Sequence, residues 1–159
     1  MTSVKVDLDN ACPGHWIPSV TMMEKWLSAA SHKLPGHPRP ARIGIRIVDE
    51  TGSAALNRNF RGKDYPTNVL SFICDLPALV SDTLKRVPLG DLAICAPIVD
   101  AEASNQGKSQ EAHWAHLLTH GFLHLHGFTH DTAPHAEAME SLEIRVLEEL
   151  GFPNPYLIN

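Results

Sequence analysis

The sequence predicts a single α+β domain, in which one small sheet of about four strands packs with four or five helices. Its 159 residues are enough for one domain and too few for two comfortable ones. Segments with the apolar alternation of strands and segments with the apolar spacing of helices follow one another along the chain. No internal repeat or long polar linker interrupts them, so we treat residues 1–159 as one domain.

The N-terminal segment predicts a strand followed by a helix. VKVDL, residues 4–8, alternates apolar and polar side chains, which is typical of a half-buried strand. Thr21 and Glu24 have the spacing of a capping box, which marks the start of a helix. Apolar residues then recur at helical spacing until Pro35, and residues 35–40 (PGHPRP) predict a loop.

The middle of the chain predicts three more strands and one short helix. In RIGIRIV, Ile43, Ile45 and Ile47 alternate with polar or small residues and therefore share one face of a strand. A short helix is expected over residues 50–59. The three strands cover residues 42–48, 68–74 and 91–96, and the loop before the last of them contains Lys85, Arg86 and Pro88.

The last third of the chain predicts mainly helices. One segment is expected near residues 98–104, and a longer helix over residues 109–126 ends at Gly127. Pro134 suits the first turn of a final helix. The apolar face of that helix consists of Met139, Leu142, Val146 and Leu150.

The composition excludes several classes of protein. A formal net charge of −5 argues against a protein that coats nucleic acid nonspecifically, because phosphate binding depends mainly on basic charge. The three cysteines form no C-x-x-C pair, which argues against a disulfide framework or a thiolate zinc cage. The chain has neither a membrane-spanning apolar run nor a signal-peptide pattern, so we expect a soluble cytoplasmic protein without a membrane partner.

Charge is distributed unevenly along the chain. Residues 39–86 carry a net positive charge, whereas the rest of the chain is rich in acidic residues. One interpretation is that solvated helices carry the acids and strands happen to carry arginines. The other is that the middle third forms a basic face for a phosphate-rich partner.

Seven of the ten histidines lie between His113 and His135, and three of them have the spacing of metal ligands. His120 and His124 are one turn apart on the predicted helix, so their imidazoles point the same way. Gly127 can adopt the left-handed conformation that ends the helix and reverses the chain. His130 can then return as the third ligand. Three neutral imidazoles with one free position are typical of catalytic zinc, so we expect one Zn²⁺ per chain.

The residue after His120 bears on the reaction. Zinc proteases with a similar helix carry H-E-x-x-H, in which the Glu acts as the general base. Gly121 occupies that position here and cannot accept a proton. Peptide hydrolysis is therefore disfavoured, and a substrate that needs charge stabilisation, such as a phosphodiester, is favoured.

Two other histidines share the helical face of His120. His113 and His116 are expected to pack there or to hydrogen-bond to the ligands rather than to bind the ion. His126 lies on the opposite face of the helix and is expected to be a surface or core residue.

In LNRNFRGKDYPTNVLSF (residues 56–72), LGDLAIC (residues 89–95) and HGFLHLHGFTH (residues 120–130), three blocks in the same order along the chain, the sequence resembles the YbeY family of bacterial rRNA-maturation endoribonucleases. HGFLHLHGFTH (residues 120–130) is similar to the family signature H-G-x-L-H-L-x-G-[YF]-D-H. LNRNFRGKDYPTNVLSF (residues 56–72) resembles its L-N-x-x-[YF]-R-G-K-x-x-P-T-[ND]-V-L-S-F block, and LGDLAIC (residues 89–95) its L-G-D-[IL]-x-I-[CS] strand. EAHWAHLLTHG (residues 111–121) fits the helix that carries the first ligands. The blocks span about two-thirds of the chain.

The resemblance implies a fold, an activity and partners. It implies a single α+β domain with a small mixed sheet and a zincin-like metal-binding helix. It also implies zinc held by His120, His124 and His130 and cleavage specific for single-stranded RNA. The substrate would be 16S ribosomal RNA, whose 3′ end is matured, and a part in ribosome quality control is also implied. The expected partners are this RNA and the small ribosomal subunit or its associated proteins, with no DNA.

The resemblance also places a catalytic residue and shows one departure. The arginine of the R-G-K block falls on Arg61, which we expect to stabilise charge on phosphorus; the alternative is a buried ion pair with Asp64 or Asp91. The family usually has Asp immediately before the third histidine. This chain has Thr129 there and Asp131 after it, and either could replace that Asp.

Two other functions remain open at this stage. One is a metal hydrolase with another substrate, and the other is a non-catalytic ribosome-assembly factor whose zinc stabilises the C-terminal helices. If the protein is a nuclease, Lys63, Arg42 and Arg46 are expected to guide the RNA.

Overall fold

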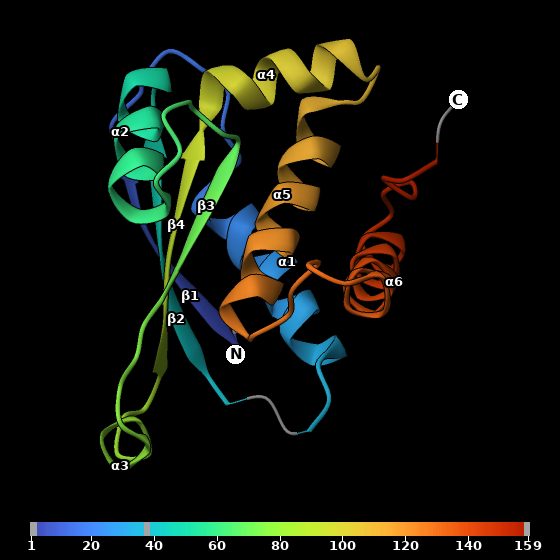
Figure 1. The fold of residues 1–159 in the computed structure, drawn as a ribbon. Helices are drawn as coiled ribbons and strands as arrows, with labels where there is room; N and C mark the ends of the chain where they lie inside the picture. Colours follow the sequence, from blue (N-terminus) through green and yellow to red (C-terminus); the bar gives the residue numbers. More distant parts are fainter. Residues whose placement is uncertain (1–2, 37–38, 158–159) are drawn as a thin grey trace.

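The structure describes residues 3–36 and 39–157, which contain four strands and six helices (Figure 1). This computed structural model has strands β1 (Val4–Asn10), β2 (Ala41–Val48), β3 (Val69–Ile73) and β4 (Val87–Cys95). Its helices are α1 (Val20–Lys33), α2 (Glu50–Arg61), α3 (Ala78–Ser81), α4 (Ala96–Asn105), α5 (Gln110–Leu125) and α6 (Ala133–Glu149). Residues 37–38 of the predicted 35–40 loop lie outside the described residues.

The strands form one mixed sheet in the order β1-β2-β4-β3. Strands β1, β2 and β4 are parallel, and β3 pairs antiparallel with β4 at the edge. Helix α2 covers one face of the sheet, whereas α1 and α5 cover the other and α6 packs outside them (Figure 1). The α+β prediction with a small four-stranded sheet is confirmed.

The core lies between the sheet and helices α1 and α5. As the alternation predicted, Ile43, Ile45 and Ile47 are all buried on one face of β2. They share one hydrophobic cluster with Trp114 and Leu118 of α5. The core therefore fixes the height and orientation of α5 relative to the sheet.

Helix α1 begins earlier than the capping-box prediction, which is wrong. The N-cap is Ser19, whose hydroxyl accepts a hydrogen bond from the backbone N–H of Met22. Glu24 instead accepts the backbone N–H of Val6 at 3.0 Å, and Ser28 accepts that of Val4 at 3.2 Å. Strand β1 is the edge of the sheet, so these two side chains satisfy donors that no neighbouring strand can reach.

The connection between β3 and β4 is shorter than expected and contains a helix, α3, that the sequence analysis missed. Strand β4 begins at Val87 rather than Asp91, so Pro88, which was expected in the preceding loop, lies within the strand. The register shifts at this point, so the irregularity accommodates a residue without an N–H. At Gly90 φ is +136°, and a Cβ would collide with the Phe72 carbonyl oxygen, so only glycine fits.

None of the described helices is long and apolar enough to cross a membrane.

Candidate metal centre

Helix α5 presents two of the three expected ligands from a buried support. Ser109 caps its N-terminus by accepting the backbone N–H of Ala112 at 3.0 Å. Trp114, Leu118 and Phe122 are completely buried against the core, which leaves His120 and His124 half-buried on another side of the helix. Burial of the apolar face thus holds both imidazoles on a rigid element.

Gly121 has a packing role that the sequence analysis did not anticipate. A Cβ at this position would lie 2.8 Å from Leu92 Cδ2 and 3.4 Å from Val69 Cγ2. Position 121 therefore faces the sheet at close approach, and a Glu side chain would not fit there. The glycine that excludes the protease general base also lets α5 pack directly on β3 and β4.

The chain reverses after α5 as predicted, which brings the third histidine back. Gly127 adopts φ +90° and donates its N–H to the carbonyl of His124, while Phe128 N–H reaches the carbonyl of Leu123. His130 follows on this return segment. His126 is exposed beside the turn and contributes no ligand atom to the cluster.

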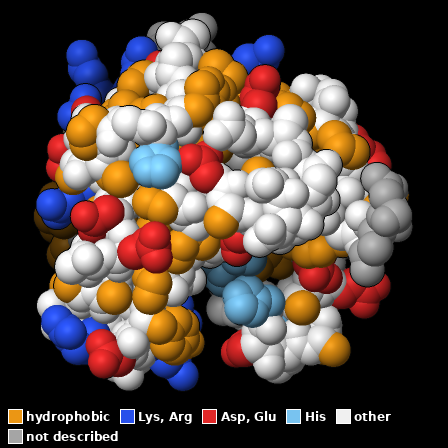
Figure 2. All heavy atoms as spheres, turned by 90° about the horizontal axis from the view of Figure 1, so that it is seen from above, with side chains coloured by type: hydrophobic (Ala, Val, Ile, Leu, Met, Phe, Trp, Pro, Cys, Tyr) orange, Lys and Arg blue, Asp and Glu red, His pale blue; other side chains and the backbone are white. Residues whose placement is uncertain are grey.

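The three predicted ligands converge. The candidate ligand nitrogens of His120, His124 and His130 all lie within 4.8 Å of one another. Their ring centroids are separated by 4.6, 5.1 and 5.5 Å. His120 and His124 are half-buried and His130 is exposed, and Figure 2 shows histidine side chains gathered at a notch in the surface. A possible three-histidine metal site therefore opens to solvent.

Hydrogen bonds assign the tautomers of the two helical ligands. Nδ1 of His124 lies 2.8 Å from the carbonyl oxygen of Phe128, and Nδ1 of His120 lies 3.2 Å from a carboxylate oxygen of Glu143. Both acceptors can only accept, so each Nδ1 carries the proton. Burial, followed by the charge of His120, lowers the pKa of His124 and favours its neutral form.

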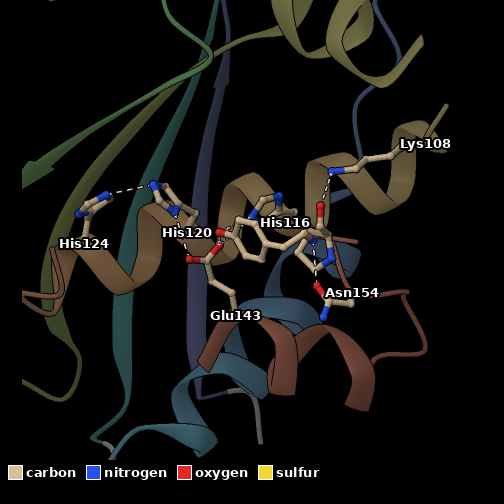
Figure 3. Close-up of polar contacts among 8 residues, drawn as sticks. Lys108, His116, His120, His124, Glu143 and Asn154 are labelled. Atoms are coloured by element: carbon tan, nitrogen blue, oxygen red, sulfur yellow. Dashed lines mark hydrogen bonds and ion pairs between the residues drawn. The ribbon is translucent and has the colours of Figure 1, made fainter. Parts of the chain in front are cut away.

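Two lone pairs consequently face each other. The Nε2 atoms of His120 and His124 are 3.0 Å apart, and neither carries a proton in the neutral rings (Figure 3). Such an arrangement is repulsive unless a proton or a metal ion lies between them. Nitrogens held at 2.0–2.1 Å from a tetrahedral zinc ion are about 3.3 Å apart, close to the observed separation. The residues present therefore fit a divalent ion with imidazole ligands.

Glu143 is a buried charged residue beside the histidines that the sequence analysis missed. It is completely buried on α6 and accepts hydrogen bonds from His116 Nε2 at 2.6 Å, Tyr156 Oη at 2.8 Å and His120 Nδ1 at 3.2 Å (Figure 3). Burial acts to raise its pKa, but the hydrogen bonds from His116 and His120 lower the pKa to about 2. The available signal was a charged residue within the apolar stripe that contains Met139 and Val146.

The two other histidines of this helical face have separate partners. His116 reaches the ligands indirectly, through Glu143, and burial lowers the pKa of its imidazole. His113 is buried and instead pairs with Glu102 of α4 at 2.9 Å. That hydrogen bond, opposed by burial, lowers the pKa of Glu102. Only His116 therefore joins the network around the site.

Neither candidate for the missing Asp contacts a ligand. Thr129 donates its hydroxyl to Asp131 at 2.8 Å, and Asp131 also lies 3.1 Å from Nδ1 of His135. Among the contacts of residues 3–36 and 39–157, neither side chain hydrogen-bonds to His130. These exposed groups stabilise the turn before α6 instead.

Arg61 lies apart from the histidines. It is the last residue of α2, on the opposite face of the sheet from α5, where Gly62 ends the helix with φ +69° (Figure 1). Its side chain is exposed and makes no ion pair with any described residue. The alternative of a buried ion pair is wrong, because Arg58 is the residue that pairs with Asp64, at 3.5 Å.

The basic face predicted from residues 39–86 is largely neutralised by pairing. Arg42 lies 3.4 Å from Asp7, and Arg46 lies 3.6 Å from Asp9, across the β1–β2 pair. Arg46, Asp7 and Asp9 border a depression of about 550 Å³ between α2 and the sheet. Arg61, Lys63 and Lys85 are exposed cations of this region that form no ion pair with any residue the structure describes.

Comparison with known proteins identifies the family. Residues 18–151 match the family model described as Endoribonuclease YbeY. The chain is 48% identical to Endoribonuclease YbeY of Xanthomonas axonopodis pv. citri (strain 306), with 98% of each chain covered. It is also 48% identical to that of Stenotrophomonas maltophilia (strain R551-3), with 95% and 92% covered.

A solved structure agrees with the fold. The solution structure of TM1509 from Thermotoga maritima matches with a TM-score of 0.53 at 20% identity, and 93% of this chain and 91% of that chain are covered. This match concerns the fold alone. The family model and the relatives at 48% identity go further, and on them the chain belongs to the endoribonuclease YbeY family.

Proposed function

We propose that this member of an endoribonuclease family cleaves single-stranded RNA with a zinc ion held by His120, His124 and His130. Its substrate is the precursor of 16S ribosomal RNA, whose 3′ end it matures in the cytoplasm, and it takes part in ribosome quality control. The observation that carries the proposal is the convergence of these three histidines, whose candidate ligand nitrogens lie within 4.8 Å of one another. Family membership supports RNA as the substrate.

The chemistry follows from the ligand set. A zinc ion held by three imidazoles lowers the pKa of a bound water to about 7 and polarises a phosphate oxygen. Helix α5 holds His120 and His124 in place, while His130 lies on the exposed return segment. Because His130 is exposed and the other two histidines are only half-buried, a phosphodiester can approach the cluster from solvent.

For Arg61 we propose the stabilisation of negative charge on the substrate phosphate. Its guanidinium is permanently charged, exposed and unpaired among the described residues, so its planar donors are available to a phosphate. Arg61 and the histidines lie on opposite faces of the sheet, with the edge strand β3 between them. A flexible single strand can cross that edge and contact both. Lys63 is placed to bind the same strand.

The charge distribution supports delivery of the RNA by other molecules. The net charge is −5, and the arginines of β2 are paired with aspartates of β1. Such a surface attracts phosphates weakly. We therefore propose that the small ribosomal subunit or its associated proteins bring the RNA to the site.

Single-turnover cleavage of an end-labelled 16S precursor fragment tests the function. We expect the purified chain to cut a single-stranded segment, to lose activity in a chelator and to regain it when Zn²⁺ is added. The same sequence annealed to a complementary strand is the matched control and should remain intact. Zinc binding without cleavage would instead indicate an assembly factor.

A further inference from the structure

Glu143 is a buried charge whose presence the proposed reaction does not explain. Its side chain is completely inaccessible to solvent, on the face of α6 that packs towards α5. Two imidazoles and one phenol surround its two oxygens (Figure 3). Helix packing alone does not require such a group, because neighbouring positions on this face are filled by Met139 and Leu142.

The carboxylate has no ordinary counter-ion. Within residues 3–36 and 39–157, its ion-pair partners are His116 and His120, and no Lys or Arg side chain pairs with it. Burial of a carboxylate is unfavourable unless hydrogen bonds or positive charge offset it; three hydrogen bonds do so here, but no Lys or Arg among the described residues adds a positive charge. A divalent ion at the three-histidine site lies just across the His120 ring and would supply that charge.

We propose that Glu143 is a positioning residue for the metal, because it accepts the Nδ1–H of His120 and so keeps the Nε2 lone pair directed at the ion. A carboxylate that hydrogen-bonds to a histidine ligand fixes its tautomer and ring orientation. His116 and Tyr156 hold the carboxylate in turn. This inference rests on the three-histidine centre of the proposed function.

Tyr156 extends this support to the C-terminal segment. Its backbone N–H donates to the side chain of Asn154 at 2.8 Å, and Lys108 donates to the carbonyl of Pro155 at 3.1 Å. Figure 3 shows these contacts in line with His116, Glu143 and His120. Loss of the Tyr156 hydroxyl should therefore weaken the support without removing the carboxylate.

Helix α5 contains another histidine that is hydrogen-bonded to a glutamate, which allows a comparison with His116 and Glu143. Glu102 accepts a hydrogen bond from His113 at 2.9 Å, as Glu143 does from His116. His113, however, is not one of the three converging histidines. Glu102 therefore joins α4 to α5 without contact to a ligand, and it provides a matched control for substitution of a carboxylate by an amide.

Zn²⁺ affinity, measured by competition with a chromophoric chelator, tests the role of Glu143. In Glu143→Gln the amide N–H₂ that faces His120 cannot accept its proton, which favours the tautomer protonated on Nε2. We expect the affinity to fall about 10- to 100-fold. Nitrogen NMR of the metal-free variant should show His120 protonated on Nε2. Tyr156→Phe should give a smaller loss, and Glu102→Gln should retain wild-type affinity.

The outcomes separate the possible explanations. Wild-type affinity and tautomer in a folded Glu143→Gln would overturn the positioning role, as would equal losses in Glu143→Gln and Glu102→Gln. If Glu143→Gln does not fold, Tyr156→Phe decides: reduced affinity supports the role and unchanged affinity overturns it. A wild-type chain that binds no Zn²⁺ would overturn the metal centre itself.

Discussion

The two faces of the sheet hold their polar groups in different ways. On the α5 face, His120 and Glu143 are held by burial and by hydrogen bonds between helices, and His124 donates to the carbonyl of Phe128. On the α2 face, Arg61 and Lys63 are exposed, and the neighbouring arginines form surface ion pairs. Surface pairs contribute little to stability, whereas a buried network fixes geometry. The fold thus holds most of the candidate metal site in advance, whereas in the proposed function the RNA would have to order the cations of the α2 face.

The largest expected effect comes from removing a histidine on the α5 face of the sheet. His124→Ala should abolish stoichiometric Zn²⁺ binding and RNA cleavage, because it removes one of two convergent Nε2 atoms. Metal analysis of the purified protein and single-turnover cleavage measure the two losses. His126→Ala is the control, since this nearby histidine lies outside the cluster. Full cleavage by the His124 variant would refute zinc catalysis.

A second substitution tests the exposed cations on the α2 face of the sheet without changing the histidines. Arg61→Ala should lower the cleavage rate by on the order of 10²-fold, if the guanidinium stabilises charge in the transition state. Zn²⁺ content and thermal stability should remain at wild-type values, because Arg61 is exposed and unpaired among the described residues. Arg58→Ala, three residues earlier in α2, is the control. Equal activity in both variants would remove Arg61 from the mechanism.

The approach of α5 to the sheet can be tested through stability. Gly121→Val should lower the free energy of unfolding by about 1–3 kcal/mol, because its side chain would press on Leu92 and Val69. Urea denaturation with and without Zn²⁺ measures this change. If α5 shifts as expected, Zn²⁺ affinity falls as well. An unchanged midpoint would mean that the contact is loose.

The smallest effect is a dependence of stability on acid pH. The pKa of Glu143 falls from 4.5 to about 2 in the folded chain. Its ionisation therefore stabilises the fold above pH 4.5, and this contribution is lost as the pH drops towards 2. Denaturation of the metal-free protein across this range should show a shallower slope in Glu143→Gln. Parallel slopes would mean that another carboxylate controls acid unfolding.

The sequence predicted those features that depend on local pattern. Alternation in β2 gave the buried isoleucines, and the positions of His120, His124 and Gly127 gave the converging histidines, because spacing within one helix and one turn decides them. Glu143 could not be placed in this way. Its role depends on how α6 packs against α5, which is a contact between distant segments.

Local signals also misled where tertiary contacts compete for the same side chain. Glu24 has the spacing of a capping box, yet its carboxylate accepts the backbone N–H of Val6 in β1. This N–H lies at the open edge of the sheet and has no neighbouring strand to accept it. Pro88 was expected in a loop, but the irregular register of β4 accommodates it. In each case the neighbouring strand, rather than the local sequence, decided the outcome.

The covered edge of β1 has a consequence for the protein at high concentration. Glu24 and Ser28 occupy the backbone donors of Val6 and Val4, which would otherwise be available to a strand of another molecule. Unprotected edges of this kind promote sheet extension and aggregation. Two side chains of one helix thus block self-association at the N-terminal end of this strand.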